Sequence, residues 1–295
     1  MRIVAVDIGG TMIKSGLWNG ETFVELRETE TCASEGGAAL MERVKGLIHS
    51  YHDFEAIGIS TAGEVNTEDG SIFYANSNIP GYTGMPVKQI MEEEFCVPAA
   101  VENDVNAAAL GELRMGAGAG AGCDDFLCLT YGTGVGGSIV MNGSVYPGSS
   151  FSAGSFGGMV IHPEEKAGTD SLEGCYERCA STTGLVRRVK KVDGSLDNGK
   201  KIFAAKDRPE IKEQIDAWID DICTGLVTLC CIFNPSRIIL GGGIMAQEYV
   251  LSEVNRKVKA QIAPGLRIVE IVPAKLANTA GMMGAVSLAE KLLAQ

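Results

Sequence analysis

The sequence lacks the excess of basic residues that binding to nucleic acids requires. Its 295 residues include 25 lysines and arginines against 37 aspartates and glutamates, which gives a net charge of −12. Broad nucleic-acid binding depends on a cationic surface, because the phosphate backbone supplies most of the affinity. The cluster of basic residues at 187–191 is predicted to be the solvated face of a helix. We therefore expect no nucleic-acid partner.

Long hydrophobic runs are also missing. The longest apolar stretch, 222–233, contains Thr and Gly and is shorter than the roughly 20 residues that a membrane span requires. The chain opens with a predicted strand and Asp7 instead of a signal peptide. Nine cysteines, an odd number lying mostly in apolar stretches, indicate reduced thiols rather than a disulfide framework. These features predict a cytoplasmic protein with no membrane partner.

Two glycine turns, each between two predicted strands, are the main positive feature. The first contains Gly9 and Gly10, and the second is Gly132-Thr133-Gly134. Because each turn joins neighbouring strands directly, the sheets must be mixed, unlike those of a dinucleotide-binding fold. The predicted strands are 2–8, 13–18, 22–30, 56–60, 99–102, 126–131, 137–141, 144–146 and 236–240. The predicted helices are about 35–50, 86–95, 209–232 and 280–294.

The polar residues around the first turn suit phosphate binding. Asp7 ends an apolar strand, where a carboxylate costs free energy unless it meets a cation, water or hydrogen-bond donors. Thr11 and Lys14 can contact phosphates, and exposed N–H groups of a glycine turn can surround phosphate oxygens. Neither turn has the Walker pattern or opens a helix. A lone glycine turn is more often only a tight turn, so the interpretation depends on there being two.

Asp104 lies at a predicted junction between a strand and a helix. Asn103 is predicted to cap that helix, which continues to Arg114. Taken alone, Asp104 is explained as a first-turn acid that the helix dipole stabilises. Beside two phosphate-binding turns, it is better explained as the base that accepts a proton from a hydroxyl group. Together these features predict a phosphoryl-transfer site between two similar domains.

Four motifs, in this order, resemble those of the ROK family of sugar kinases and repressors. They are Asp7-Ile8-Gly9-Gly10-Thr11, Glu102-Asn103-Asp104-Val105-Asn106-Ala107-Ala108, Gly132-Thr133-Gly134-Val135-Gly136-Gly137 and Leu240-Gly241-Gly242-Gly243-Ile244. The resemblance covers nearly the whole chain. It implies an α/β, two-domain actin-like ATPase fold, which is ribonuclease H-like, with mixed sheets flanked by helices around a central cleft. The expected domains are 1–115, with the helix 280–295 packed back on it, and 116–279.

The resemblance implies that the chain transfers the γ-phosphate of ATP to the 6-hydroxyl group of a glucose-like hexose. Asp104 would be the catalytic base, and Asp7 would lie near Mg²⁺ through water. The residues expected to bind the cofactor ATP are Asp7, Gly9, Gly10, Thr11, Lys14, Gly132, Thr133, Gly134, Gly242 and Gly243. Those expected at the sugar are Gly63, Asn78, Asn103, Asp104, Ser155 and Glu177. Family members are often dimers, so a homodimer is an open alternative.

The chain departs from the family pattern near the anomeric end of the expected sugar pocket. Ser155 and Gly158 stand where the family has a Glu and a His. The family's structural zinc takes that His and three cysteines, of which only Cys175 remains. The other ligand positions hold Gly158, Gly168 and Asp170. His162 lies nearby in the sequence, but one His and one Cys do not make a four-coordinate site, so no structural zinc is expected.

These departures leave the substrate open. Loss of two polar groups and their bulk favours a pocket that accepts a substituent at C1 or C2, as in the β-glucoside kinases of the family. A general hexose kinase is slightly favoured over this alternative. A catalytically silent sugar-binding regulator is a third alternative, although Asp104, Asp7, Thr11 and Thr133 are intact. A DNA-binding repressor is disfavoured, because the predicted first strand begins at Arg2 and leaves no room for a preceding helix-turn-helix domain.

Overall fold

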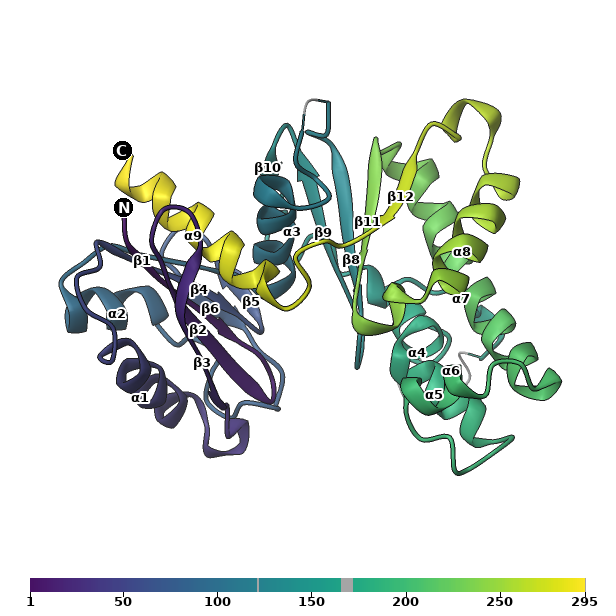
Figure 1. Ribbon diagram of the computed structural model, residues 1–295, viewed down its shortest axis with the longest axis horizontal. Coiled ribbons are helices and arrows are strands. Elements are labelled where there is room, and N and C mark those ends of the chain that lie inside the picture. The colour runs from purple at the N-terminus through teal and green to yellow at the C-terminus, as the bar shows by residue number, and fades with distance from the viewer. Residues whose placement is uncertain (121, 166–171, 295) are drawn as a thin grey trace. The chain divides into compact units, whose positions relative to one another are not determined.

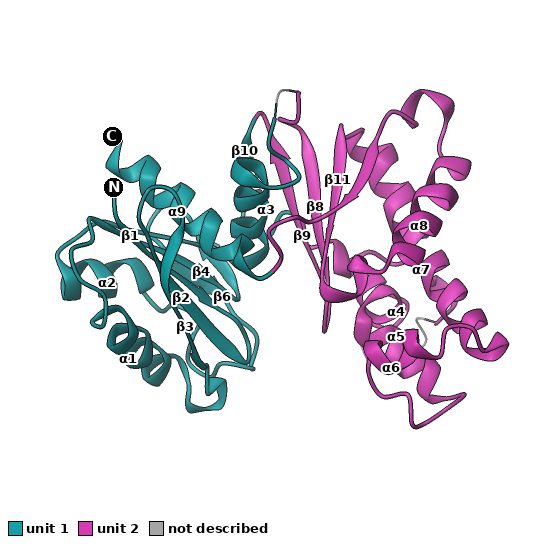
Figure 2. Cartoon of the chain, in the orientation of Figure 1, with its two compact units in different colours: residues 1–120, 143–153, 278–295 teal, residues 121–142, 154–277 magenta. Residues whose placement is uncertain are grey.

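The computed structural model describes residues 1–120, 122–165 and 172–294 (Figure 1). The chain forms two compact units (Figure 2). Residues 1–120, 143–153 and 278–295 make up the first unit, and residues 121–142 and 154–277 make up the second. The sequence-based division placed all of 116–279 in one domain, whereas 143–153 is grouped here with the first unit. Among the described helices, none has the length and apolar character of a membrane span.

The first unit contains a mixed sheet in the order β3-β2-β1-β4-β7. The antiparallel hairpin β1–β2 surrounds the first glycine turn, and β4 and β7 run parallel to β1. Its strands are β1 (Ile3–Ile8), β2 (Met12–Trp18), β3 (Phe23–Glu30), β4 (Ala56–Thr61) and β7 (Ala99–Asn103), with a separate hairpin of β5 (Glu64–Asn66) and β6 (Ser71–Tyr74). Its helices are α1 (Gly37–Ile48), α2 (Val87–Phe95), α3 (Asp104–Met115) and α9 (Ala280–Leu293).

The two faces of this first sheet are built differently. Side chains alternate along a strand, so Val4 and Val6 of β1 point to one face, where they join a buried cluster with Val44 of α1. The opposite face is covered by α9, which contacts β1, β4 and β7 and also packs along α3 (Figure 1). A side-chain carbon on Gly58 would lie 2.3 Å from the carbonyl oxygen of Ala285. Close approach of α9 to the sheet therefore depends on small residues.

The second unit repeats the arrangement of hairpin and parallel strand. β8 and β9 are antiparallel around the second glycine turn, and β11 runs parallel to β8. The order is β10-β9-β8-β11-β12, with strands β8 (Phe126–Tyr131), β9 (Val135–Met141), β10 (Ser144–Val145), β11 (Arg237–Gly241) and β12 (Glu270–Pro273). The helices are α4 (Tyr176–Ala180), α5 (Thr182–Lys190), α6 (Gly199–Ala204), α7 (Pro209–Phe233) and α8 (Glu248–Gln261). The short β10 belongs to the segment 143–153.

The long helix α7 illustrates how the sequence sets element boundaries. Pro209 occupies the first turn, where a missing N–H costs nothing, and Asn234 ends the helix in the left-handed conformation with φ 44°. The structure confirms mixed sheets flanked by helices, and each element predicted from the sequence is present within about two residues of its expected bounds. The hairpin β5–β6, the helices α4, α6 and α8, and β12 were not predicted, and of α5 only the basic segment 187–191 was expected to be helical.

Candidate functional site

Asp7 is positioned by the register of three strands. It lies on β1 opposite Lys14 of β2 and Ser60 of β4. Ser60 Oγ donates a hydrogen bond of 2.6 Å to Asp7 Oδ1. Burial raises the pKa of the Asp7 carboxyl, and the Ser60 hydrogen bond and the charge of Lys14 oppose that rise. A carboxylate in this environment gains from a nearby cation, and its oxygen chemistry suits Mg²⁺ held through water.

The first glycine turn is held in place from the end of β3. Thr31 Oγ1 donates to the carbonyl oxygen of Gly9 at 2.7 Å, and Thr31 N donates to that of Thr11 at 2.9 Å. Gly10 and Thr11 are exposed at the tip of the turn. The tip therefore offers backbone N–H groups and a hydroxyl group to solvent on a rigid base, which suits a phosphate. Thr31 was not predicted to take part.

Asn103 caps α3 and orients the residue that follows it. Its Oδ1 accepts hydrogen bonds from the backbone N–H groups of Val105 and Asn106, as predicted for a helix cap. Its Nδ2 donates to the carbonyl oxygen of Gly63 at 2.8 Å and to Asp104 Oδ1 at 3.0 Å. Both ends of the amide are thus occupied within the protein. Asn103, Asp104 and Gly63 are brought together as one group.

Asp104 is half-buried at the start of α3. Burial, and then the negative charge of Asp7, raise the pKa of the Asp104 carboxyl to about 6. Hydrogen bonds from Val105 N and Asn103 Nδ2 favour the ionised form and limit the rise. A carboxylate with a pKa near 6 is a stronger base than an ordinary aspartate and is still ionised at neutral pH. The geometry therefore suits proton acceptance from a neutral hydroxyl group.

Two residues of this group were missed by sequence reasoning. A side-chain carbon on Gly281 of α9 would lie 2.7 Å from Asp7 Oδ1 and 2.8 Å from Ser60 Oγ. Glu102 is 4% exposed, and its Oε1 accepts from Asn103 N at 2.9 Å and from Asn106 Nδ2 at 3.1 Å, directly behind the cap. The run of small residues in α9 could have pointed to Gly281. The alternation of buried residues in β7 gave no sign that Glu102 takes part.

Asn78 stands apart from this group in the described contacts. Its side chain is exposed, and its backbone N–H donates to Asn76 Oδ1 at 3.1 Å. No hydrogen bond between described residues links Asn78 to Asp104 or Gly63. Its expected sugar-binding role stays a prediction.

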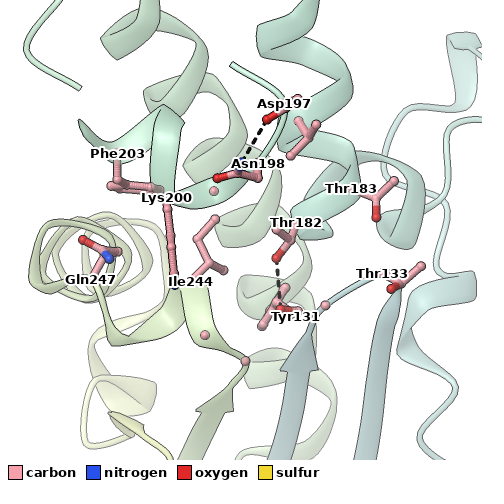
Figure 3. Close-up of a pocket in the computed structure, with 15 residues that line it drawn as sticks. Tyr131, Thr133, Thr182, Thr183, Asp197, Asn198, Lys200, Phe203, Ile244 and Gln247 are labelled. Carbon is pink, nitrogen blue, oxygen red and sulfur yellow. Dashed lines mark hydrogen bonds between the residues drawn. The ribbon is translucent and has the colours of Figure 1, made fainter. Parts of the chain in front are cut away.

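The second unit holds a cavity of about 680 Å³ at its own glycine turn (Figure 3). Four of the residues predicted to bind the nucleotide line it: Gly132, Thr133, Gly242 and Gly243. Gly242 has φ 103°, and a side-chain carbon there would lie 2.3 Å from the carbonyl oxygen of Tyr131. Only glycine therefore allows the end of β11 to approach the end of β8 closely. The volume is in the range of sites that hold a small molecule or cofactor.

Apart from Ile244, which ends the fourth motif, the remaining walls of this cavity come from segments that sequence reasoning did not identify. Ile244 and Phe203 supply apolar surface, and Asn198 and Gln247 add amide groups (Figure 3). Thr182 Oγ1 donates to the carbonyl oxygen of Tyr131 at 3.1 Å, which ties α5 to the turn. Apolar walls with a few amide groups suit a purine ring, and the adjoining glycine turn suits its phosphates.

The carboxylate of Glu177 is hydrogen-bonded to the end of the second glycine turn. Its Oε2 accepts a hydrogen bond of 3.1 Å from Val135 N. Side-chain carbons on Gly134 and Gly157 would lie 2.1 Å from Glu177 Oε2 and 3.1 Å from its Cβ. Glu177 therefore braces the turn at Gly134 against the segment around Gly157. Its expected contact with the sugar stays a prediction.

The two positions that depart from the family pattern are open to solvent. Ser155 and Gly158 are exposed, and the space around a side-chain carbon on Gly158 contains no atom within 4 Å. Cys175 is buried and precedes α4. The other two expected zinc positions, Gly168 and Asp170, lie outside the described residues.

A cluster of three side chains with metal-binding chemistry does occur nearby. Single ligand atoms of His162, Cys179 and Asp221 lie within 4.8 Å of one another. His162 Nε2 and Asp221 Oδ1 are already joined by a hydrogen bond of 2.8 Å, and Asp221 also forms an ion pair with Arg188. Arg188 belongs to the basic cluster that was predicted to be solvated, and its side chain is 31% exposed while it pairs with Asp221. Among the described residues this cluster offers three donors where structural zinc takes four, and a guanidinium group lies beside its carboxylate, so these residues do not fit structural zinc.

Comparison with known proteins gives a consistent result. The model of the ROK family matches residues 3–292. A β-glucoside kinase of Listeria innocua is 36% identical over 295 residues, covering 97% of this chain and 96% of the relative. A glucokinase of Halalkalibacterium halodurans is 34% identical over 309 residues, covering 95% and 92%. A ROK family glucokinase from Streptomyces griseus, solved with glucose and AMPPNP, has a TM-score of 0.83 at 30% identity and covers 99% of this chain and all of that one.

Proposed function

Since this chain belongs to the ROK family and has its actin-like ATPase fold, we propose that it transfers the γ-phosphate of ATP to the 6-hydroxyl group of a hexose. The observation that carries this proposal is the group around Asp104. A carboxyl with a pKa of about 6 lies at the start of a helix, fixed by Asn103 and near Asp7.

In this mechanism Asp104 accepts the proton of the sugar hydroxyl group as its oxygen attacks phosphorus. Phosphoryl transfer needs mainly positioning and charge stabilisation, so one base with a fixed rotamer suffices. Asn103 holds Oδ1 of Asp104, which leaves Oδ2 to face the hydroxyl group. Gly63, whose carbonyl oxygen is bound to Asn103, would border the sugar.

ATP would bind to both glycine turns. The cavity beside Gly132 and Gly242 would take the adenosine, with Thr133 and Gly134 at the β- and γ-phosphates. Gly9, Gly10, Thr11 and Lys14 would contact the phosphates from the first unit. Asp7 would hold Mg²⁺ through water, and the ion would neutralise charge on the phosphates.

The substitution Asp104→Asn tests the base. It keeps the size and the cap contacts but cannot accept a proton, so kcat should fall by about 10²- to 10⁴-fold while the KM for ATP changes little. Release of ADP in the presence of glucose is the measurement, with Asp69→Asn as the control because Asp69 is a turn residue that bonds only Ser71 among the described residues. A variant that keeps near-normal kcat would exclude Asp104 as the base.

A second substrate class is favoured by the open positions at Ser155 and Gly158. Exposed small residues replace two large polar ones there, so a C1 substituent would meet little obstruction. One relative, 36% identical, is a β-glucoside kinase, which fits this alternative. ADP release should be compared across glucose, mannose, N-acetylmannosamine, methyl β-glucoside and cellobiose. Turnover with none of the sugars would favour a silent sugar-binding protein instead.

A further inference from the structure

The exposed aromatic side chains among the described residues come from two segments of the first unit. Phe73 and Tyr74 lie on β6 with exposed fractions of 49% and 55%, and Tyr146 follows β10 with 51%. Phe151, a few residues further along, is half-buried. The rings of Phe73 and Phe151 lie 5.5 Å apart between centroids at 66°. Two rings in contact at a surface form a small apolar platform.

The backbone at Phe151 is held in a costly conformation. Its φ is 61°, in the left-handed region that bulky side chains avoid. The loop around it is closed by a hydrogen bond of 3.2 Å from Ala153 N to the carbonyl oxygen of Pro147, and by Ser152 Oγ to Ser150 O at 3.0 Å. A closed loop that holds an aromatic residue in a strained conformation is typical of a functional position. In this conformation the Phe151 ring contacts that of Phe73.

Both segments contact elements that carry the group around Asp104. β5 packs along β7, which ends at Asn103, and β10 packs against α3, which begins at Asp104. A side-chain carbon on Gly63 would lie 3.0 Å from the carbonyl oxygen of Tyr74, so the end of β6 abuts the carbonyl that holds Asn103. In the chain, Phe151 precedes Ser155 by four residues. The platform therefore adjoins Gly63, which is proposed to border the sugar, and lies in the chain just before Ser155.

We propose that Phe73 and Phe151 form a subsite for the C1 substituent of a β-glucoside, and that this substituent is a ring. The proposal rests on the proposed function and names its substrate class. An aryl ring, or the apolar C–H face of a second pyranose, can lie against aromatic rings, whereas the methyl group of methyl β-glucoside covers little of them. Free glucose has no group to place there.

The experiment compares kcat/KM for phenyl β-glucoside, cellobiose, methyl β-glucoside and glucose in the wild type, Phe73→Ala and Phe151→Leu. Phe151→Leu keeps an apolar side chain of similar length, so it tests the ring without emptying the loop. Tyr74→Ala is the matched control. Tyr74 is the next residue on the same strand and is similarly exposed, and among the described residues its ring contacts neither Phe73 nor Phe151.

The expected result is a fall of about 5- to 20-fold in the ratio of kcat/KM for the ring-bearing glucosides to that for glucose in both phenylalanine variants. The ratio for methyl β-glucoside, and all ratios in Tyr74→Ala, should change by less than about twofold. Unchanged ratios for the ring-bearing glucosides would overturn the proposal, as would an equal loss on all four sugars.

Calorimetric binding of phenyl β-glucoside separates this proposal from the kinase assignment. If the protein turns over no sugar, the proposed function fails, but tighter binding of phenyl β-glucoside than of glucose, lost in Phe73→Ala and kept in Tyr74→Ala, would still support the subsite. Equal binding of the two sugars by the wild type would overturn the subsite whatever the activity.

Discussion

The side-chain amide of Asn103 donates a hydrogen bond of 3.0 Å to Oδ1 of Asp104, the residue that follows it. The same amide nitrogen donates to Gly63, and the amide oxygen caps α3. One side chain thus connects the start of α3, the segment that follows β4 and the carboxylate of Asp104. This coupling explains why a helix cap and a proposed catalytic base are adjacent in the sequence.

We predict that the activity of the free enzyme rises with pH through an apparent pKa near 6. Asp104 must be ionised to accept a proton, and burial together with Asp7 raises its pKa to about 6. kcat/KM for the sugar, measured from pH 4.5 to 8.5, should increase and then level off above neutral pH. A profile that is flat between pH 5 and 7 would contradict it.

The raised pKa of Asp104 also makes the stability of the protein depend on pH. The dependence is opposite to that caused by an aspartate in a salt bridge, whose pKa is lowered. Because the pKa of Asp104 is raised in the folded state, folding is penalised as pH rises from the ordinary aspartate range through about 6. Asp104→Asn should therefore raise the free energy of unfolding at pH 7.5 by about 1 to 2 kcal/mol and change it little at pH 4. Urea unfolding at the two pH values checks this, and a destabilised variant at pH 7.5 would refute it.

The packing of α9 on α3 should tolerate no side chain at Gly284. A side-chain carbon there would lie 1.7 Å from the carbonyl oxygen of Ala107, so the helices must separate. Gly284→Ala should lower the free energy of unfolding by about 2 kcal/mol or more. Gly46→Ala is the control, because Gly46 lies within α1 with open space around it and alanine should stabilise that helix by about 0.5 to 1 kcal/mol. Equal effects in the two variants would exclude close packing as the cause.

Gly242 should be required for nucleotide binding. Alanine there combines an unfavourable φ of 103° with a contact of 2.3 Å to Tyr131, so the cavity wall must shift. We expect the KM for ATP in Gly242→Ala to rise about tenfold or more, with little effect on the sugar. Gly265→Ala, an exposed position with open space, serves as the control. An unchanged KM would show that the nucleotide binds elsewhere.

His162 should stabilise the protein at acidic pH and not at alkaline pH. The hydrogen bond to Asp221, and to a smaller degree that to Glu164, raises the pKa of His162 in the folded state. Its contribution is complete below the unfolded pKa of about 6.5 and is lost as pH rises through the higher folded pKa. His162→Gln should cost about 1 kcal/mol at pH 5.5 and much less at pH 9, with the exposed His52→Gln unaffected at both. A pH-independent loss would assign His162 a packing role only.

The features of the fold and of the proposed site that could be predicted from the sequence are those that depend on residues close together in the chain. The strand ending at Asp7, the two glycine turns and the cap at Asn103 are local, because backbone freedom, alternation and a capping side chain act within a few residues. Their positions follow from the sequence alone.

Contacts between distant segments were decided only by the tertiary structure. Gly281 lies against Asp7 and Ser60 from a helix more than 200 residues away, and Arg188 pairs with Asp221 of another helix. The ring of Phe73 contacts that of Phe151, which lies in a loop where its backbone has φ 61°. The pKa of Asp104 is likewise raised by burial and by Asp7, on another strand. A sequence specifies which groups exist, whereas packing decides which of them share one small, poorly solvated space.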